Sequence, residues 1–274
     1  METMPVDGLT LFFDPQERQA AELMRHACEK SIRLIRACWG LETPQDCRVY
    51  VMTSWRRFLF HSSPWTWRIL LGVSVPAWYS RVQRLWRIAG GWVQRYGRRV
   101  AVGVKPARLV ERADRSMGER IFYGQDDMDE KVQQVTCHEL VHAFAAHLRL
   151  PLWLNEGLAM VTVDRYFQKP TVRYETLEVL RRWAGGTGPG EYRSLSYKDQ
   201  DAVVYHCVRG YWITRYLEDT RPELLRSLLS QRHRRRALED KVAAALGRGR
   251  EAFWRDIDGV VACHFKEEGS SLAE

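Results

Sequence analysis

The segment HELVH contains three side chains whose types and spacing suit metal chemistry: His138, Glu139 and His142. An α-helix advances about 100° per residue, so positions i and i+4 lie about 40° apart and about 6 Å along the axis. The two imidazoles therefore project from one face of a helix and can bind a single ion, and neutral imidazole suits zinc. Glu139 emerges beside the first histidine, where its carboxylate can take a proton from a water molecule that the ion activates. The spacing therefore predicts a hydrolytic metal site.

Two histidines leave a tetrahedral ion short of protein ligands, and Glu156 is the candidate for the third. It lies in the segment WLNEGLA, with thirteen residues between it and His142. That interval fits the end of one helix, a corner bounded by Pro151, and the start of a second helix. We expect the second helix to fold back and to place Glu156 facing the ion. The alternative is an amphipathic helix with two surface histidines, and the carboxylate in WLNEGLA argues against it.

HELVH followed by PLWLNEGLA resembles the gluzincin metallopeptidases, and the wider outline resembles the bacterial peptidase MA-like family. The likeness covers roughly residues 8–260 and is weak outside 131–167. It implies that His138, His142 and Glu156 bind one Zn²⁺ ion per chain and that Glu139 is the general base. The spacer before Glu156 is shorter than in the gluzincin aminopeptidases, and no GxMEN-type motif is present. Aminopeptidase activity is therefore not implied.

A further catalytic group is expected downstream, because gluzincins often use a tyrosine or histidine to stabilise the oxyanion. The segment VVYHCVRGYW offers three such side chains: Tyr205, His206 and Tyr211. We favour Tyr205, with a core tyrosine as the alternative. The family-like register would place Cys207 where a tyrosine is often found. Asp164 is a candidate carboxylate partner for a zinc-bound histidine, against an ordinary surface acid.

The elements that must position these residues begin with strands and one long helix. Alternating, β-rich patterns predict strands at residues 8–13, 47–53 and 98–106. Asp14 and Pro15 predict a helix start, and Gly40 predicts its end. Helical patterns follow from residue 129 onward, interrupted by Pro151 and by the loop GGTGPG.

We therefore expect an α+β fold that is predominantly α. A small N-terminal β-sheet with helices, an HExxH active-site helix and a C-terminal helical region would make it gluzincin-like. The expected division has three parts: an N-terminal α/β part with a basic, tryptophan-rich insert at about 54–100, the zinc-binding helices with a C-terminal helical part, and a polar tail, at residues 1–130, 131–267 and 268–274 respectively.

The positive charge of the chain is concentrated in one region. The chain of 274 residues has a net charge of +8, yet residues 47–110 contain 12 lysines and arginines and no acid. The rest of the chain therefore sums to 8 − 12 = −4. Six of the 11 tryptophans lie in residues 54–100. The first interpretation is a helical subdomain whose tryptophans are core residues and whose arginines are solvated or paired. Peripheral contact with an anionic membrane is the next, a lid over the cleft follows, and nucleic acid is the least favoured partner.

The sequence also bears on location and class. No signal-peptide pattern opens it, and no apolar run reaches the roughly 18–20 residues of a membrane span, so we expect a cytoplasmic protein, peripherally membrane-associated if the insert binds lipid. The six cysteines form no CxxC pair and are expected to be free thiols. The leading hypothesis is a zinc metallopeptidase that acts on a peptide or protein substrate. The alternative is a catalytically silent gluzincin-fold binding module that acts through its basic surface at a membrane or an acidic partner.

Overall fold

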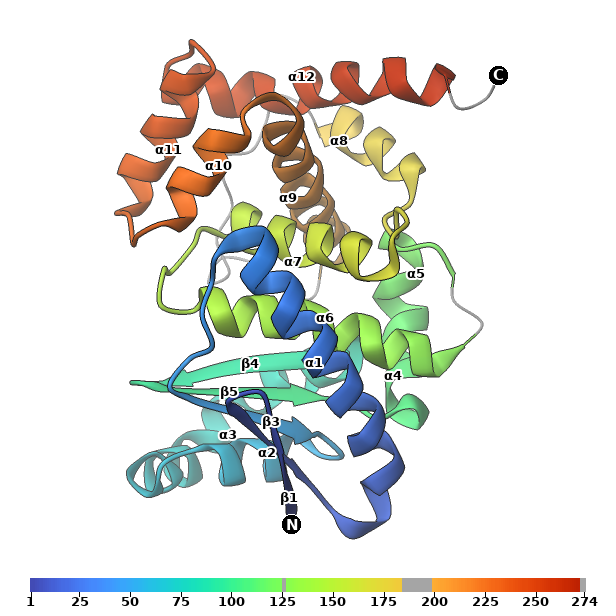
Figure 1. The fold of residues 1–274 in the computed structure, drawn as a ribbon, viewed down its shortest axis with the longest axis vertical. Helices are drawn as coiled ribbons and strands as arrows, with labels where there is room; N and C mark the ends of the chain where they lie inside the picture. Colours follow the sequence, from blue (N-terminus) through green and yellow to red (C-terminus); the bar gives the residue numbers. More distant parts are fainter. Residues whose placement is uncertain (125–126, 184–198, 272–274) are drawn as a thin grey trace.

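A computed structural model describes residues 1–124, 127–183 and 199–271 (Figure 1). Five strands form one mixed sheet in the order β1-β2-β3-β5-β4. Their bounds are β1 Glu2–Val6, β2 Leu9–Phe13, β3 Asp46–Val51, β4 Gly91–Tyr96 and β5 Arg99–Val104. The three central strands are parallel, and they are the three that the sequence predicts. The antiparallel edge strands β1 and β4 were not expected. The small N-terminal sheet in a mainly helical α+β fold is confirmed.

Helices α1 (Arg18–Trp39) and α6 (Met128–Ala145) cover one face of the sheet, and α7 (Leu152–Phe167) lies beyond them (Figure 1). A short 3-10 turn that begins at Pro15 leads into α1, as the Asp-Pro pair predicts. Gly40 ends α1 in the left-handed conformation, with φ of 63°, which a glycine adopts without steric cost. The apolar faces of these helices and the inner face of the sheet form the main core.

The opposite face of the sheet is covered by α2 (Trp55–Ser62) and α3 (Trp65–Ile88) (Figure 1). The basic insert thus consists of two helices followed by the edge strand β4. Four of its six tryptophans belong to a second apolar cluster against the sheet, where Trp55 is buried and three are partly buried: Trp78, Trp86 and Trp92. The other two, Trp65 and Trp67, are exposed. A helical subdomain with core tryptophans therefore describes only part of the insert.

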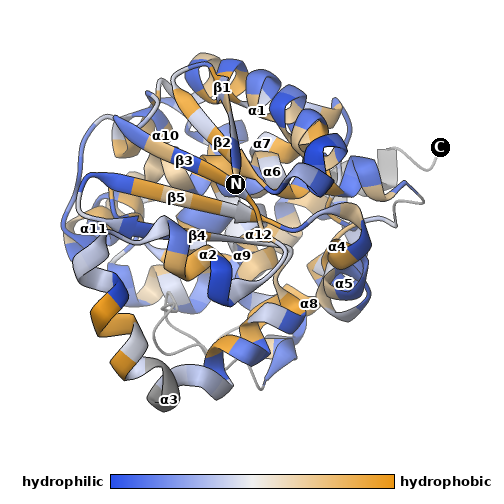
Figure 2. Ribbon diagram, turned by 90° about the horizontal axis from the view of Figure 1, so that it is seen from below, coloured by the Kyte–Doolittle hydropathy of each residue, from blue (hydrophilic) through white to orange (hydrophobic). Residues whose placement is uncertain are grey.

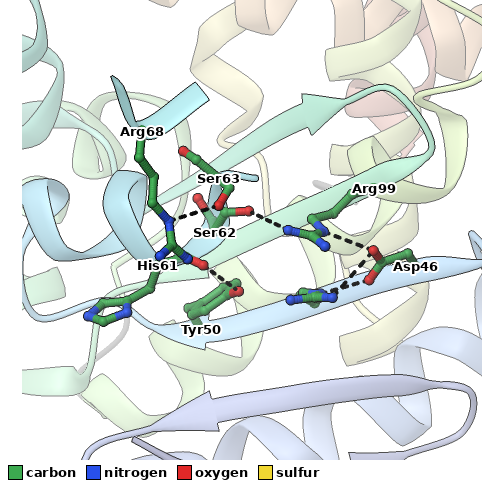
Figure 3. Close-up of polar contacts among 8 residues, drawn as sticks. Asp46, Tyr50, His61, Ser62, Ser63, Arg68 and Arg99 are labelled. Atoms are coloured by element: carbon green, nitrogen blue, oxygen red, sulfur yellow. Dashed lines mark hydrogen bonds and ion pairs between the residues drawn. The ribbon is translucent and has the colours of Figure 1, made fainter. Parts of the chain in front are cut away.

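The corner between α2 and α3 is tied to the sheet by hydrogen bonds to its backbone (Figure 3). The carbonyl of His61 accepts from Tyr50 at 3.4 Å, and the carbonyl of Ser62 accepts from Arg99 at 3.5 Å. The carbonyl of Ser63 accepts from Arg68 at 3.2 Å. Asp46 orients Arg99 by accepting from its Nε at 2.8 Å. Because Tyr50 and Arg99 lie on neighbouring strands, the corner has a fixed position relative to β3 and β5.

The chain after β5 is helical. Short helices α4 (Ala107–Ala113) and α5 (Glu119–Ile121), with a π-helical turn between them, lead into α6. Beyond α7 come α8 (Leu177–Trp183), α9 (Gln200–Thr220), α10 (Pro222–Leu229), α11 (Arg235–Ala245) and α12 (Arg250–Ser271). Helix α12 includes the first four residues of the expected polar tail. The loop GGTGPG and residues 272–274 lie outside the described residues.

The cysteines and the lengths of the helices also bear on the expectations from the sequence. All six cysteines are free, as predicted. In the described part of the chain, no helix combines the length and the apolarity that crossing a bilayer requires.

Candidate metal centre

The corner between α6 and α7 brings the predicted ligands together. Helix α6 ends at Ala145, three residues after His142, and Pro151 is the N-cap of α7. Pro151 is extended, with φ of −64° and ψ of 156°, which redirects the chain before α7 begins. Glu156 follows in the second turn of α7 and faces back toward α6. The expected fold-back of the second helix is therefore present.

Potential ligand atoms of three residues converge at this corner. The Nε2 atoms of His138 and His142 are 3.0 Å apart, and the Glu156 carboxylate oxygens lie 3.4 Å and 3.6 Å from them, respectively. The three side chains are only 12–19% exposed. A tetrahedral ion with zinc–ligand bonds of about 2.0–2.1 Å separates its ligand atoms by about 3.3 Å. The observed separations bracket this value, so the donor set fits a small divalent ion that accepts nitrogen and oxygen ligands.

Close packing between α7 and α9 holds Glu156 in place. At Gly157, a Cβ atom would lie 2.3 Å from the carbonyl oxygen of Gly210 and 2.0 Å from Thr214 Oγ1. At Gly210, a Cβ atom would lie 2.4 Å from the carbonyl oxygen of Trp153. The two helices therefore touch backbone to backbone at this crossing, which only glycine permits. The residue next to Glu156 is thus fixed against a second helix.

Glu139 lies between α6 and the edge strand β4. A Cβ atom on Gly91, the first residue of β4, would come within 2.4 Å of Glu139 Cγ and 2.8 Å of its Oε1. Burial raises the pKa of Glu139 to about 7; the charge of His138 opposes this shift and that of Glu156 adds to it. A carboxyl group with a pKa near neutrality can both accept and release a proton at neutral pH.

The two histidines have different electrostatic surroundings. Burial lowers the pKa of His142 to about 4, so its ring is neutral at physiological pH and a lone pair is available to a metal. Burial also acts to lower the pKa of His138, but its hydrogen bond to Glu156 and the charge of that carboxylate outweigh burial and raise it. The carboxylate and His138 therefore compete for a proton at the position that an ion would take.

These four residues lie in the wall of a cavity of about 540 Å³. Helix α6 supplies the histidines and Glu139, and the first residues of β4 form the facing wall. The remaining walls are largely apolar and come from α3, α4, the π-helical turn, α5, α7, α9 and their connections, among them Leu85, Val110, Met117, Phe122, Leu150 and Met160. This volume is within the range of small-molecule and peptide side-chain sites.

One polar side chain in the wall of this cavity, that of Gln134, was not predicted from the sequence. Gln134, one helical turn before His138, is 2% exposed and lines the cavity. Neither its amide nitrogen nor its amide oxygen has a hydrogen-bond partner among the described residues. Beside it, Lys131 forms a buried ion pair with Asp114 at 2.6 Å. The signal was the spacing 131, 134 and 138, which places all three α6 side chains on one helical face.

The structure does not bring Tyr205 to the other predicted residues. Its hydroxyl donates to Asp258 at 2.7 Å, its ring stacks on Trp183, and it is not among the described residues that line the cavity. Arg209 binds the other oxygen of Asp258, so Tyr205 belongs to a buried polar network between α9 and α12. Cys207 lines the cavity instead, and burial raises its pKa well above the ordinary thiol value.

The other tyrosine and the candidate second carboxylate contact each other. Tyr211 donates to Asp164 at 2.7 Å, and Asp164 also accepts from the backbone N–H and the hydroxyl of Thr171. Asp164 is buried rather than a surface acid, and these contacts fix the end of α7. No hydrogen bond between Asp164 and a histidine is present in the described part of the chain.

Comparison with protein-family models gives no match, and comparison with curated proteins gives none either.

Proposed function

We propose that this protein is a zinc-dependent metallohydrolase of the gluzincin type and that it acts as a peptidase. The observation that carries the proposal is the convergence of His138, His142 and Glu156, whose nearest nitrogen and oxygen atoms are 3.0–3.6 Å apart, with Glu139 beside them in the wall of one cavity. A structural zinc site needs four closed protein ligands, whereas three ligands that face a cavity leave a position for a reacting molecule. This donor set therefore supports a catalytic rather than a structural role.

The chain's own groups support hydrolysis. A zinc ion held by the three ligands would polarise a carbonyl group and make water more acidic. Glu139 is placed to accept a proton from the attacking water and to deliver it to the departing amine, which its pKa near 7 favours. Because Gly91 has no Cβ, it leaves room for this carboxyl group beside β4. No further residue is assigned to oxyanion stabilisation.

The cavity walls support an extended peptide as the substrate. Strand β4 is last in the strand order, so one of its edges has no neighbouring strand among the described residues. Residues 91–93 of this strand line the cavity. An extended peptide can add to such an edge through main-chain hydrogen bonds, with alternate side chains entering pockets. The unpaired amide of Gln134 offers one donor and one acceptor to a peptide group in the same cavity.

The alternative is a silent binding module that keeps the fold and the metal. The position of Glu139 argues against it. Burying an ionisable carboxyl group costs free energy, and a module that only binds gains nothing from it. Glu139→Gln separates the two hypotheses, since it keeps the size of the side chain and removes the proton acceptor.

The test is turnover of a broad quenched-fluorescence peptide library by the zinc-loaded protein. We expect the wild type to cleave library members. We expect Glu139→Gln to bind zinc with equal stoichiometry but to cleave roughly 100- to 10,000-fold more slowly, which is the usual contribution of general-base catalysis. A wild type that holds zinc but shows no turnover beyond that of Glu139→Gln would favour the silent module. Loss of zinc stoichiometry in His142→Ala checks that the ion occupies this site.

The proposed location is the cytoplasm. Six free thiols are typical of a reducing compartment, which supports this proposal.

A further inference from the structure

The N-terminal half of α3 carries an unusual concentration of exposed apolar side chains. Among the described residues, seven of the ten exposed large hydrophobic side chains lie between Phe60 and Tyr79. The most exposed are Val73 at 81%, Trp65 at 72% and Ile69 at 61%. Isolated exposed apolar residues are common on protein surfaces, but a cluster of this kind indicates a surface that binds something.

The three most exposed side chains form one helical face. Trp65, Ile69 and Val73 are spaced at i, i+4 and i+8, so they lie within about 80° of one another around the helix. The opposite face of α3 packs on the sheet through Val82 and its neighbours in the second apolar cluster. Figure 2 shows α3 at the edge of the molecule, away from α1, α6 and α7. The apolar face is therefore an outer surface of the insert and not part of its core.

Two arginines continue the same face toward the end of α3. At about 100° per residue, Arg84 and Arg87 lie about 100° and 40° around the helix from Trp65, on the side of Ile69. Neither has a carboxylate partner among the described residues. The segment around them, residues 47–110, contains no acid that could offset their charge. Helix α3 thus presents an apolar half followed by a basic half on one outer face.

We propose that this face of α3 docks on an anionic lipid surface. Its apolar half would enter the interface between headgroups and acyl chains, where tryptophan is favoured, and Arg84 and Arg87 would meet the headgroup phosphates. The charge favours lipid over a second copy of this chain, since self-association on α3 would bring two acid-free, strongly basic segments together. The aliphatic side chains favour lipid over nucleic acid, because Ile69 and Val73 can neither bind phosphate nor stack on bases.

The fold presents this face in a fixed orientation relative to the catalytic cavity. The carbonyls of His61 and Ser62, just before α3, accept hydrogen bonds from the sheet residues Tyr50 and Arg99 (Figure 3). At the other end of α3, Leu85 and Ile88 line the cavity that holds the metal ligands. The rise of 1.5 Å per residue places Leu85 about 18 Å along the helix from Val73. Docking therefore brings the cavity close to the lipid surface, although lipid binding does not depend on the proposed peptidase activity.

The experiment is co-sedimentation of the full chain with vesicles of phosphatidylcholine alone or of phosphatidylcholine mixed with phosphatidylglycerol. We expect binding to the mixed vesicles, weak binding to the neutral ones, and loss of binding as salt is raised. Each basic residue near an anionic surface contributes about a factor of five, so the double variant Arg84→Gln/Arg87→Gln should bind roughly 25-fold more weakly. The triple variant Trp65→Ser/Ile69→Ser/Val73→Ser should lose binding even at low salt.

A matched control removes two arginines elsewhere. Arg232 and Arg236 are exposed in a basic run near α11, and their replacement by glutamine removes the same charge without touching α3. We expect this control to bind mixed vesicles like the wild type. All variants alter outer side chains, so unchanged thermal unfolding verifies that they are folded.

The proposal is overturned if the wild type fails to bind mixed vesicles, or if the α3 variants bind as well as it does. It is also overturned if the charge-matched control is as defective as Arg84→Gln/Arg87→Gln. Sedimentation velocity without lipid gives a separate readout: self-association that the triple variant abolishes would identify α3 as a contact between copies instead. Preferential binding of a single-stranded oligonucleotide over mixed vesicles would assign the face to nucleic acid.

Discussion

Replacing Gly157 with alanine should damage both the fold and the metal site. The added Cβ would lie 2.3 Å from the carbonyl oxygen of Gly210, whereas a close carbon–oxygen contact is about 3.3 Å. Helices α7 and α9 would therefore have to separate by about 1 Å. Because the obstacle includes backbone as well as the Thr214 side chain, a rotamer change alone cannot relieve it.

The magnitude follows from two opposing effects. Overpacking of a tight core contact costs about 3 kcal/mol at the upper end of its usual range. Replacing a helical glycine with alanine stabilises a helix by about 1 kcal/mol, so the net loss is about 2 kcal/mol. For a chain of this size, that lowers the Tm by roughly 4–8 °C. Glu156 precedes the substituted residue and moves with it, so zinc affinity should fall roughly 10- to 100-fold, as when ligand orientation is disturbed.

The assay is thermal unfolding without metal, followed by zinc titration against a competing chelator. Gly259→Ala is the matched control: it lies in helix α12, and nothing lies within 4 Å of its added Cβ. It should raise stability by about 1 kcal/mol and leave zinc affinity unchanged. If Gly157→Ala behaved like Gly259→Ala in both measurements, the close α7–α9 crossing would not be what positions Glu156.

Three other perturbations test separate parts of the site. Gly91→Ala should displace the Glu139 side chain, which is flexible enough to yield. The kcat should therefore fall roughly 100-fold, with zinc stoichiometry and Tm nearly unchanged. Loss of zinc instead would contradict this placement of Glu139. Gln134→Leu should raise KM roughly tenfold with little change in kcat, because it removes a peptide-binding amide; an unchanged KM would exclude Gln134 from substrate binding. Chelation should lower the Tm of the wild type by several degrees relative to zinc-loaded protein, since ligand at about 100 times Kd stabilises by about 2.7 kcal/mol; the same shift in Glu156→Ala would place the ion elsewhere.

Local spacing was enough to predict that the three candidate metal ligands lie together. The i and i+4 positions of His138 and His142 fix their common face once α6 forms. Glu156 could be added because Pro151 forces a corner at a distance that lets the next helix return. The central strands and α1 were also predictable, since their periodicity and their caps lie within short stretches of sequence.

The orientation of α9 could not be predicted in this way. Residues 205 and 207 point about 160° apart on a helix. An error in the rotation of α9 about its axis therefore decides which of the two is predicted to line the cavity and which to be buried elsewhere. Contact with α7 decides the rotation: Gly210 must face α7, which turns Cys207 toward the cavity and Tyr205 toward Asp258. Gly210 was the sequence signal for this choice, but its partner Gly157 lies more than fifty residues away.

Strand β4 was missed for a related reason. Its residues, GWVQRY, lie inside a basic, tryptophan-rich segment whose composition dominates any local pattern. The strand is defined by antiparallel pairing with β5, from Gly91↔Val104 to Tyr96↔Arg99. The two strands follow each other through a tight turn at Gly97, where φ is 63°. The glycine pair at the start of the strand, Gly90 and Gly91, and Gly97 after it were the local signs.

Zinc K-edge X-ray absorption on the zinc-loaded protein tests the proposed metal centre. We expect one zinc ion per chain with nitrogen and oxygen ligands only, at about 2.0–2.2 Å, and imidazole scattering from two histidines. Cys207 lines the same cavity, so a sulfur ligand at about 2.3 Å is a real alternative. A sulfur shell, scattering from a single imidazole, or zinc that is lost on dialysis would contradict the metal centre proposed for His138, His142 and Glu156.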